Sequence, residues 1–342
     1  MPEPKPKSHS CHVNPEARGH PVCEQSTPPE HLLSGTDHSN ETGKGVGHSP
    51  PRPRCSIGMP VYNGADFLGQ AIDSVLDQDF QDFELIIADN ASTDKTAEIC
   101  RAYAEKDPRI KFVRHPRNIG AAKNYNYVFH CAAGEYFNWL AHDDILGPDF
   151  LSACLAQFAR STHDTLLVYP TFTFVDENTC ETREEVPVCV QSTAVSAPRR
   201  MYEVLDELGV VTSVFGMFRR KALGQTRLIG SFIGSDYVLL VESALLGKII
   251  RVGGDPRFMR RLHDKGSQRA NRTADERAKW FDPEIQADRR PTRRLTREYL
   301  NSILSLPGLT VYERIGAIAL LINQRIRGKY RVWARRFRRN GA

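Results

Sequence analysis

Short apolar runs alternate with segments of helical period in the region that follows residue 54. The runs, which predict β-strands, cover residues 55–62, 84–89, 110–114 and 135–140. The segments in which apolar residues recur every three or four positions, which predict helices, cover residues 68–76, 94–106, 121–132 and 148–160. Strands that alternate with helices of this length are joined by βαβ crossovers. The pattern therefore predicts an α/β fold with a mainly parallel sheet and helices on both faces.

The pattern is less regular between residues 161 and 269. Strands are predicted at 166–170, 172–176, 213–219 and 256–262, and helices after Pro198 and at 235–246. No internal repeat is visible. One large domain, residues 54–269, therefore explains the body of the chain better than two average domains.

The first part of the chain, residues 1–53, differs from this body. It is rich in Pro, Ser, His, Gly and Glu and has no apolar periodicity, so a disordered tail is predicted. Four of its residues could in principle bind zinc: Cys11, His12, His20 and Cys23. Their spacing matches no standard zinc finger, and a plain tail is the preferred interpretation.

The last part, residues 270–342, is predicted to be a helical, basic extension. Apolar side chains keep a helical period from Val311 to Phe337, while Arg and Lys occupy the other faces. We consider three roles for residues 311–339: an arm packed on the body or on another subunit, a helix on an anionic membrane surface, and a nucleic-acid contact. We do not expect nucleic acid, because no reading motif accompanies the basic residues.

Composition and charge add to this division. Hydrophobic residues make up 40% of the chain and charged residues 25%, an ordinary globular balance that allows a sizeable core. The net charge is +5, but nine basic and no acidic residues follow from Arg314 to the end, and residues 1–54 carry six of each sign. Residues 1–54 therefore contribute no net charge and the tail contributes +9. Subtracting +9 from the total of +5 leaves a net charge of −4 for residues 55–313. The body is therefore mildly acidic and the tail cationic.

The cysteines and the apolar runs indicate in which cellular compartment the protein is expected. The eight cysteines include no CxxC pair, and several fall inside apolar patterns, so we expect reduced and mostly buried thiols. The start of the chain lacks the apolar core of a leader peptide, and no run reaches the roughly 18 apolar residues of a spanning helix. We expect a cytoplasmic protein that the tail could hold at the inner face of a membrane.

Polar residues lie where three of the predicted strands end. These are Asn63, Asp89 and Asp143, and ligands of parallel sheets bind at the carboxyl ends of the strands, so we expect one shared site. Asp143 and Asp144 are adjacent carboxylates after an apolar run. They suit a divalent cation, and such a cation could hold a diphosphate.

Six segments, in this order, resemble those of the family 2 glycosyltransferases, which have the nucleotide-diphospho-sugar transferase fold called GT-A. They are Met59-Pro60-Val61-Tyr62-Asn63, Ala88-Asp89-Asn90-Ala91-Ser92-Thr93-Asp94, Asn118-Ile119-Gly120, His142-Asp143-Asp144, Gly234-Ser235-Asp236 and Arg261-Leu262-His263. The resemblance covers roughly residues 55–269. It implies an inverting, metal-dependent transfer of a sugar from a UDP- or dTDP-linked donor to the hydroxyl of a sugar, lipid-linked or polysaccharide acceptor, in envelope or surface polysaccharide or glycolipid synthesis.

The resemblance also implies where the nucleotide-sugar lies. The residues that would line its pocket are Pro60, Val61, Tyr62 and Asn63. Asp89 would read the base, and a carboxylate suits the imide N–H of uracil or thymine. Asp89 could instead cap the next helix, and for Asp94 a cap is the preferred interpretation. Asn118, Gly120 and Lys123 open a predicted helix, where a phosphate or ribose contact and simple turn chemistry are equally compatible with the sequence.

The acidic run departs from the family's Asp-x-Asp motif, because Ala141 stands where the first Asp is usual. By resemblance His142, Asp143 and Asp144 contact the donor, and Asp143 binds Mn²⁺ or Mg²⁺. His263 would be a second metal ligand, and its imidazole favours Mn²⁺. Losing the first carboxylate predicts weaker or altered metal dependence. Without the resemblance, the two carboxylates could simply be a helix-capping loop.

The resemblance places the catalytic base at Asp236, which would take the proton of the acceptor hydroxyl. Asp236 could also be only the cap of the helix that it opens. Trp139, Phe215 and Arg219 are candidates for the acceptor side, although core packing is an equal explanation for the two aromatic residues.

Other functions remain to be compared with this one. A non-catalytic nucleotide-sugar-binding or scaffold protein of the same fold is the main alternative, because of Ala141. A dinucleotide-dependent oxidoreductase is disfavoured, because no G-x-G-x-x-G follows the first strand. A nucleotidyltransferase normally has a glycine-rich, basic loop there, which residues 59–64 are not.

Overall fold

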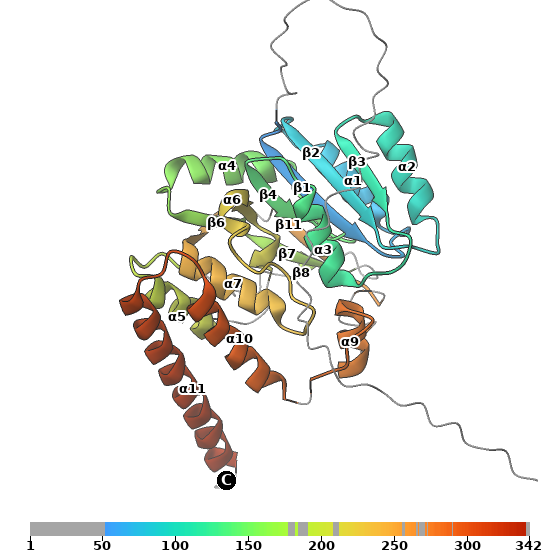
Figure 1. Ribbon diagram of the computed structural model, residues 1–342. Coiled ribbons are helices and arrows are strands. Elements are labelled where there is room, and N and C mark those ends of the chain that lie inside the picture. The colour runs from blue at the N-terminus through green and yellow to red at the C-terminus, as the bar shows by residue number, and fades with distance from the viewer. Residues whose placement is uncertain are drawn as a thin grey trace, which may run out of the picture. The chain divides into compact units, whose positions relative to one another are not determined.

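One large sheet forms the centre of the protein (Figure 1). The computed structural model describes residues 52–176, 182–183, 191–207, 212–254, 257–264, 266, 271, 273–288 and 290–339, with only the backbone for 176, 182–183 and 327–339. Within these residues seven strands pair in the order β10-β6-β9-β4-β1-β2-β3. Their bounds are β1 (Cys55–Val61), β2 (Phe83–Asp89), β3 (Ile110–Arg114), β4 (Tyr136–Trp139), β6 (Thr165–Pro170), β9 (Met217–Arg219) and β10 (Lys248–Val252).

The large sheet is mainly parallel, as predicted. Only β9 runs antiparallel to its neighbours, β4 and β6. Every residue of β1 and β2 is buried, which explains why both strands read as continuous apolar runs in the sequence. The prediction of an α/β fold is confirmed.

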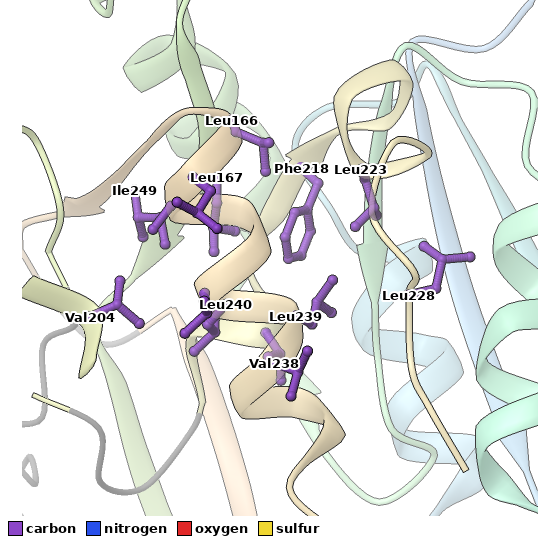
Figure 2. Packing of buried hydrophobic residues seen from close by; sticks show 14 of the residues in the cluster. Leu166, Leu167, Val204, Phe218, Leu223, Leu228, Val238, Leu239, Leu240 and Ile249 are labelled. Carbon is purple, nitrogen blue, oxygen red and sulfur yellow. The ribbon is translucent and has the colours of Figure 1, made fainter. Parts of the chain in front are cut away.

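Helices cover both faces of this sheet. They are α1 (Leu68–Leu76), α2 (Thr96–Lys106), α3 (Ala121–His130), α4 (Phe150–Arg160), α5 (Ala197–Glu207), α6 (Arg220–Leu223) and α7 (Ser235–Leu246). Consecutive side chains of β2 point to opposite faces. Leu85 and Ile87 pack in one buried cluster with α1 and α4, and Ile86 and Ala88 in another with α3, α5 and α7. Figure 2 shows part of the second cluster around α7.

A second, smaller sheet joins the end of β4 to a strand much later in the chain. Its order is β5-β11-β7-β8, with β5 (Ile145–Leu146), β7 (Phe172–Asp176), β8 (Thr182–Arg183) and β11 (Phe258–Leu262). β5 follows Asp144 directly, and its partner β11 ends directly before His263. The pairing therefore carries His263 to the acidic run, although 120 residues separate the histidine from Asp143.

The C-terminal helices pack on the same body. They are α9 (Ala274–Phe281), α10 (Pro291–Ser305) and α11 (Val311–Arg339). α9 contacts α3, α10 packs on α7, and α11 lies beside α5 (Figure 1). Ala317 and Leu321 of α11 are buried in the cluster that surrounds α7. The predicted amphipathic helix is confirmed, and one of its faces packs on the body.

A buried carboxylate ties α10 to α7. Glu242 of α7 is fully buried, and its oxygens accept hydrogen bonds from Arg227 Nε at 2.6 Å, the Arg227 N–H at 2.8 Å and Ser302 Oγ of α10 at 2.8 Å. Arg227 also forms an ion pair with Glu298 of α10 at 2.8 Å. The network closes the space between α7, α10 and the loop that carries Arg227.

Several predicted elements differ from those observed. The predicted strand at 213–219 is wrong in its first part, where Ser213–Phe215 is a 3₁₀ helix, and only Met217–Arg219 pairs in the sheet. A Cβ atom at Gly216 would lie 2.6 Å from Tyr169 Cβ and from the Val168 carbonyl oxygen. The backbone therefore passes so close to β6 at this point that no residue with a side chain fits. The strand predicted at 256–262 begins at Phe258 in the described residues.

Other predictions concern the cysteines and the membrane. Cys55, Cys100, Cys131 and Cys154 are free thiols, three of them buried, as expected; Cys11, Cys23, Cys180 and Cys189 lie outside the described residues. The predicted disorder of residues 1–53 and the candidate zinc ligands also lie outside them, apart from residues 52 and 53. Among the helices described, none is both long enough and apolar enough to cross a bilayer.

Candidate active site

A cavity of about 1110 Å³ opens where β1, β2 and β4 end. One wall consists of the end of β1 and the loop that follows it, and it is lined by Pro60, Val61, Tyr62, Asn63 and Gly64. The acidic run and the end of β11 form further walls. The cavity lies at the carboxyl ends of parallel strands, where ligands of open α/β sheets bind.

The loop after β1 is held by the loop after β2. Asn63 has a positive φ of 50°, its N–H donates to Ser92 Oγ at 2.8 Å, and its side-chain oxygen accepts from the Thr93 N–H at 2.8 Å. The Gly64 N–H donates to Thr96 Oγ1 at 2.9 Å. These side-chain-to-backbone bonds fix the backbone that forms the first wall of the cavity.

Asp89 does not line the cavity, although the next residue, Asn90, does. The side chain of Asp89 is fully buried, Oδ1 accepts from the Ser92 N–H at 2.9 Å, and Oδ2 lies 3.3 Å from Arg114 Nε. Oδ2 has no hydrogen-bond partner among the described residues. Asp89 therefore anchors the loop through Oδ1 and pairs with Arg114 through Oδ2.

Asn90, which the sequence analysis did not single out, lines the cavity beside Asn118. Asn90 Nδ2 donates to Asn118 Oδ1 at 2.9 Å, and Asn90 Oδ1 accepts from the Ile119 N–H at 2.8 Å. The two amides hold the segment before α3 against the end of β2. Asn90 directly follows Asp89 in the motif at residues 88–94, and this position was the signal that could have identified Asn90 from the sequence.

Gly120 and Lys123 make structural contacts instead of lining the cavity. Gly120 has φ +86°, and a Cβ there would lie 2.5 Å from the Phe281 carbonyl at the end of α9, so only glycine fits. Lys123 forms an ion pair with Asp282 at 3.0 Å. Of the three residues predicted at this turn, the structure brings only Asn118 to the cavity.

Asp143 and His263 meet on the cavity wall. His263 Nε2 lies 2.8 Å from Asp143 Oδ2, and the ring of Phe67 packs edge-on against the imidazole with a centroid distance of 4.5 Å. Burial alone would raise the pKa of Asp143, but the hydrogen bond with His263 and the nearby histidine charges outweigh it and lower this pKa to about 2. Asp143 is therefore a carboxylate at any ordinary pH.

His142 and Asp144 flank this pair differently. His142 packs so closely on the loop after β1 that a Cβ on Gly64 would overlap the imidazole. Asp144 is buried, and its Oδ1 accepts from the Arg261 N–H at 3.0 Å. Burial, followed by the charge of Asp143, raises the pKa of Asp144 well above its ordinary value. The two neighbouring carboxyl groups thus differ strongly in acidity.

Arg261 holds the acidic run in place. Its Nε donates to the Asp143 carbonyl at 3.1 Å and its Nη2 to Gln70 Oε1 of α1 at 2.6 Å. The guanidinium also lies over the ring of Phe67 at 4.7 Å. The side chain of Arg261 is therefore occupied by structural contacts, whereas His263, two residues later, faces Asp143.

Asp236 lies in the first turn of α7, after Gly234, whose φ is +86°. Asp236 Oδ1 accepts from the adjacent Tyr237 N–H at 3.0 Å. Burial raises the pKa of Asp236, and the Tyr237 hydrogen bond and the charge of Arg260 oppose this only in part. Asp236 is not among the residues that line the cavity, but Arg260 lines it and acts electrostatically on both Asp236 and Asp144.

The last wall of the cavity comes from α9. Glu276, Lys279 and Trp280 line it, together with Asn271. The sequence analysis assigned these residues to a separate extension from residue 270 onward. A readable signal was present, because Thr273 and Glu276 form a capping box at the start of α9.

The three acceptor-side candidates lie in different places. Trp139 is buried in an aromatic cluster, and its Nε1 donates to the Tyr125 carbonyl at 2.9 Å, so it is a core residue. Phe215 lines the cavity and stacks on Phe258. Arg219 donates to the Thr165 carbonyl at 2.9 Å and does not line the cavity.

The sequence model of the family described as Glycosyl transferase family 2 matches residues 56–227, half of the chain. The chain belongs to glycosyl transferase family 2. The match covers β1 to β9 and therefore the first wall, the acidic run and most of the large sheet, while Asp236, His263 and α9 lie beyond it.

Relatives that are named glycosyltransferases match a shorter part of the chain. An uncharacterised glycosyltransferase of Haemophilus influenzae is 38% identical over 124 residues, 36% of this chain and 49% of its own length. The glycosyltransferase GlyG of Streptococcus pneumoniae is 30% identical over 112 residues, 33% of this chain and 37% of its own length. The matched region thus spans less than half of these relatives.

A solved structure shares the fold. TarS of S. aureus, residues 1–349 in complex with UDP-GlcNAc, superposes with a TM-score of 0.58 at 17% identity and covers 79% of this chain and 72% of its own. At this identity the likeness concerns the fold, which is the GT-A architecture of a mainly parallel sheet flanked by helices.

A divalent cation fits the Asp143 and His263 pair. Adjacent ligands of an octahedral ion at about 2.1 Å lie roughly 3 Å apart, and the two ligand atoms here are 2.8 Å apart. Among the described residues no group of three or more His, Cys, Asp or Glu gathers around one point. Asp143 and His263 are therefore the two described residues that could hold a cation here.

Proposed function

We propose that the protein is an inverting, metal-dependent glycosyltransferase that uses a UDP- or dTDP-linked sugar and an acceptor hydroxyl. The observation that carries this proposal is the cavity at the strand ends, in which Asp143 faces His263 at 2.8 Å beneath the loop after β1. Membership of glycosyl transferase family 2 supports the reaction class.

The nucleotide would lie against the segment from Pro60 to Asn63. Asp89 Oδ2, which lies 3.3 Å from Arg114 Nε and accepts no hydrogen bond among the described residues, would accept the imide N–H of uracil or thymine. Asn90 and Asn118 offer amide groups beside it. The crystal structures of TarS with UDP and with UDP-GlcNAc, which share the fold, are consistent with a uridine donor.

Asp143 and His263 would hold the cation. When bound, the ion would neutralise the negative charge that develops on the leaving diphosphate. The low pKa of Asp143 keeps this ligand ionised without the ion. A mixed carboxylate and imidazole pair suits Mn²⁺ better than Mg²⁺. His142 and Asp144 shape the same wall, and Ala141 leaves the protein with one carboxylate fewer than the usual motif.

Asp236 would remove the proton from the acceptor hydroxyl as its oxygen attacks the anomeric carbon. A single displacement of this kind inverts the anomeric centre. The base must be ionised before it acts, and the raised pKa of Asp236 makes its carboxylate a stronger proton acceptor.

Turnover in the presence of Mn²⁺ tests this function. Purified protein with UDP-sugars or dTDP-sugars, acceptor extracts and Mn²⁺ should release nucleoside diphosphate, and EDTA should abolish most of the release. Asp143→Asn should lower the apparent affinity for Mn²⁺ about 10- to 100-fold, because it removes the only carboxylate of the pair. The readout is the Mn²⁺ concentration that gives half-maximal release.

Asp149→Asn, on the exposed side chain that pairs with Arg257, is the matched control and should leave the Mn²⁺ dependence unchanged. A wild-type protein that binds UDP by calorimetry without any response to Mn²⁺, and that turns over no donor, would support the non-catalytic binding protein instead.

The exposed face of α11 supports a peripheral membrane site for the acceptor. Val311, Ile315, Ile322 and Ile326 are 54–70% exposed and lie on one face of the helix, apart from the buried Ala317 and Leu321. Nine basic residues follow from Arg314 onward in the sequence. Apolar side chains with flanking positive charge suit an anionic lipid surface.

We expect the wild type to float with vesicles that contain anionic phosphatidylserine, and the triple variant Ile315→Asn, Ile322→Asn and Ile326→Asn to stay unbound. Val195→Asn is a matched control, because Val195 is 94% exposed but lies before α5. Equal flotation of the triple variant and the wild type would exclude α11 as the membrane contact.

A further inference from the structure

Arg260 is a cation on the wall of the cavity, and no described residue is hydrogen-bonded to its guanidinium. It lies on β11, lines the cavity and is half-buried. Among the described residues, its guanidinium forms no hydrogen bond or close ion pair, whereas Arg261 beside it donates to Asp143 and Gln70. Both arginines line the cavity, but neighbouring side chains of a strand point in opposite directions, so Arg260 does not share the contacts of Arg261.

The surroundings of Arg260 are acidic but do not satisfy its donors. Its charge acts on Asp144 and Asp236, and also on the hydroxyl of Tyr125, but it forms no hydrogen bond with any of the three. Asp144 Oδ1 is already engaged by the Arg261 N–H, and Asp236 Oδ1 by the Tyr237 N–H. A guanidinium offers five N–H donors in a planar fork, and this fork matches two oxygens of one phosphate.

We propose that Arg260 binds a phosphate oxyanion of a substrate through this fork, between the Asp143 and His263 pair and Asp236. The inference rests on the proposed function and adds a specific anion contact to it. The oxyanion can come from two sources: the diphosphate of the donor, on the Asp144 side, or a phosphate carried by the acceptor, on the Asp236 side. In either case Arg260 would hold the anionic group inside the cavity.

Calorimetry with two probes tests the contact and separates the two sources. The proteins are the wild type, Arg260→Met, Arg260→Lys and the control Arg101→Met, whose arginine is exposed on α2. UDP and uridine are titrated first, both with Mn²⁺. Inorganic phosphate is then titrated into protein saturated with UDP.

A donor contact predicts that Arg260→Met weakens UDP binding about 10- to 100-fold and leaves uridine binding unchanged, as expected for one lost charge-assisted bidentate contact. An acceptor contact predicts unchanged UDP binding, with phosphate binding to the UDP complex about 10- to 100-fold weaker. In both cases Arg260→Lys should retain part of the affinity, because it keeps the charge but loses the fork.

Unchanged binding of both UDP and phosphate in Arg260→Met would overturn the inference. So would a variant that only melts at a different temperature, because Arg260 would then merely balance the charges of Asp144 and Asp236. Failure of the proposed function looks different: the wild type itself would release no nucleoside diphosphate, whatever the state of residue 260.

Discussion

Replacing Asp236 by asparagine should lower kcat about 10²- to 10⁴-fold, the usual contribution of a general base. The amide keeps the size of the side chain and its hydrogen bond from the Tyr237 N–H, but it cannot take the proton from the hydroxyl of the acceptor substrate. Donor binding should be little affected, because Asp236 does not line the donor cavity. Initial rates at saturating donor, together with the Kd for UDP, separate the two effects.

The pH dependence of the wild type should carry the signature of the same residue. Because burial raises the pKa of Asp236, the carboxylate becomes protonated, and the rate falls, at a higher pH than for an exposed aspartate. The acidic limb of kcat against pH should therefore lie above the ordinary range of aspartate, which is about 4. In Asp236→Asn this limb should vanish from the residual rate.

Asp77→Asn, at the exposed end of α1, provides the control and should keep both kcat and the pH profile. A kcat within threefold of the wild type in Asp236→Asn, or an acidic limb that survives the substitution, would remove Asp236 from the role of base.

Glu242→Ala should destabilise the fold by about 3 kcal/mol, near the lower end of the range for breaking a buried ion pair. The substitution leaves the Arg227 guanidinium, its N–H and the Ser302 hydroxyl without their shared acceptor. The lower end applies because the Arg227 side chain is 39% exposed and keeps its ion pair with Glu298. Urea unfolding followed by circular dichroism measures the loss.

Glu242→Gln is the matched variant, since its amide oxygen still accepts from Arg227 or Ser302. It should lose about half as much stability. A loss below about 1 kcal/mol in Glu242→Ala, or equal losses in both variants, would mean that the network does not hold α10 on α7.

The parts of the fold that were predictable have strong local patterns. The predicted bounds of Ile110–Arg114, Phe172–Asp176 and Ser235–Leu246 agree with the structure, because each segment is an apolar run or a helical period with clear polar limits. β10 was missed, since its two central isoleucines lie between charged residues and make too short a run. The helices α9 and α10 lie in the extension that was predicted to be helical, but the sequence analysis did not place their bounds.

The site was predictable only in part, for a physical reason. The strand-end rule groups Asn63, Asp89 and Asp143 from sequence alone, but it cannot say which of them lines the cavity and which does not. The approach of His263 to Asp143 depends on the pairing of β5 with β11, a contact that no local pattern reveals. The ion pair of Lys123 with Asp282 likewise depends on where α9 packs.

The bonds between the loops after β1 and β2 have a consequence for ligand affinity. Hydrogen bonds within the protein hold the loop after β1 in one conformation, and they come from Asn63, Ser92, Thr93 and Thr96. The conformational entropy of this loop is therefore lost during folding. A nucleotide that enters meets a preorganised surface and need not order it. The free energy of its contacts is then expressed as affinity, and the nucleotide portion of any donor should bind with little rearrangement of this loop.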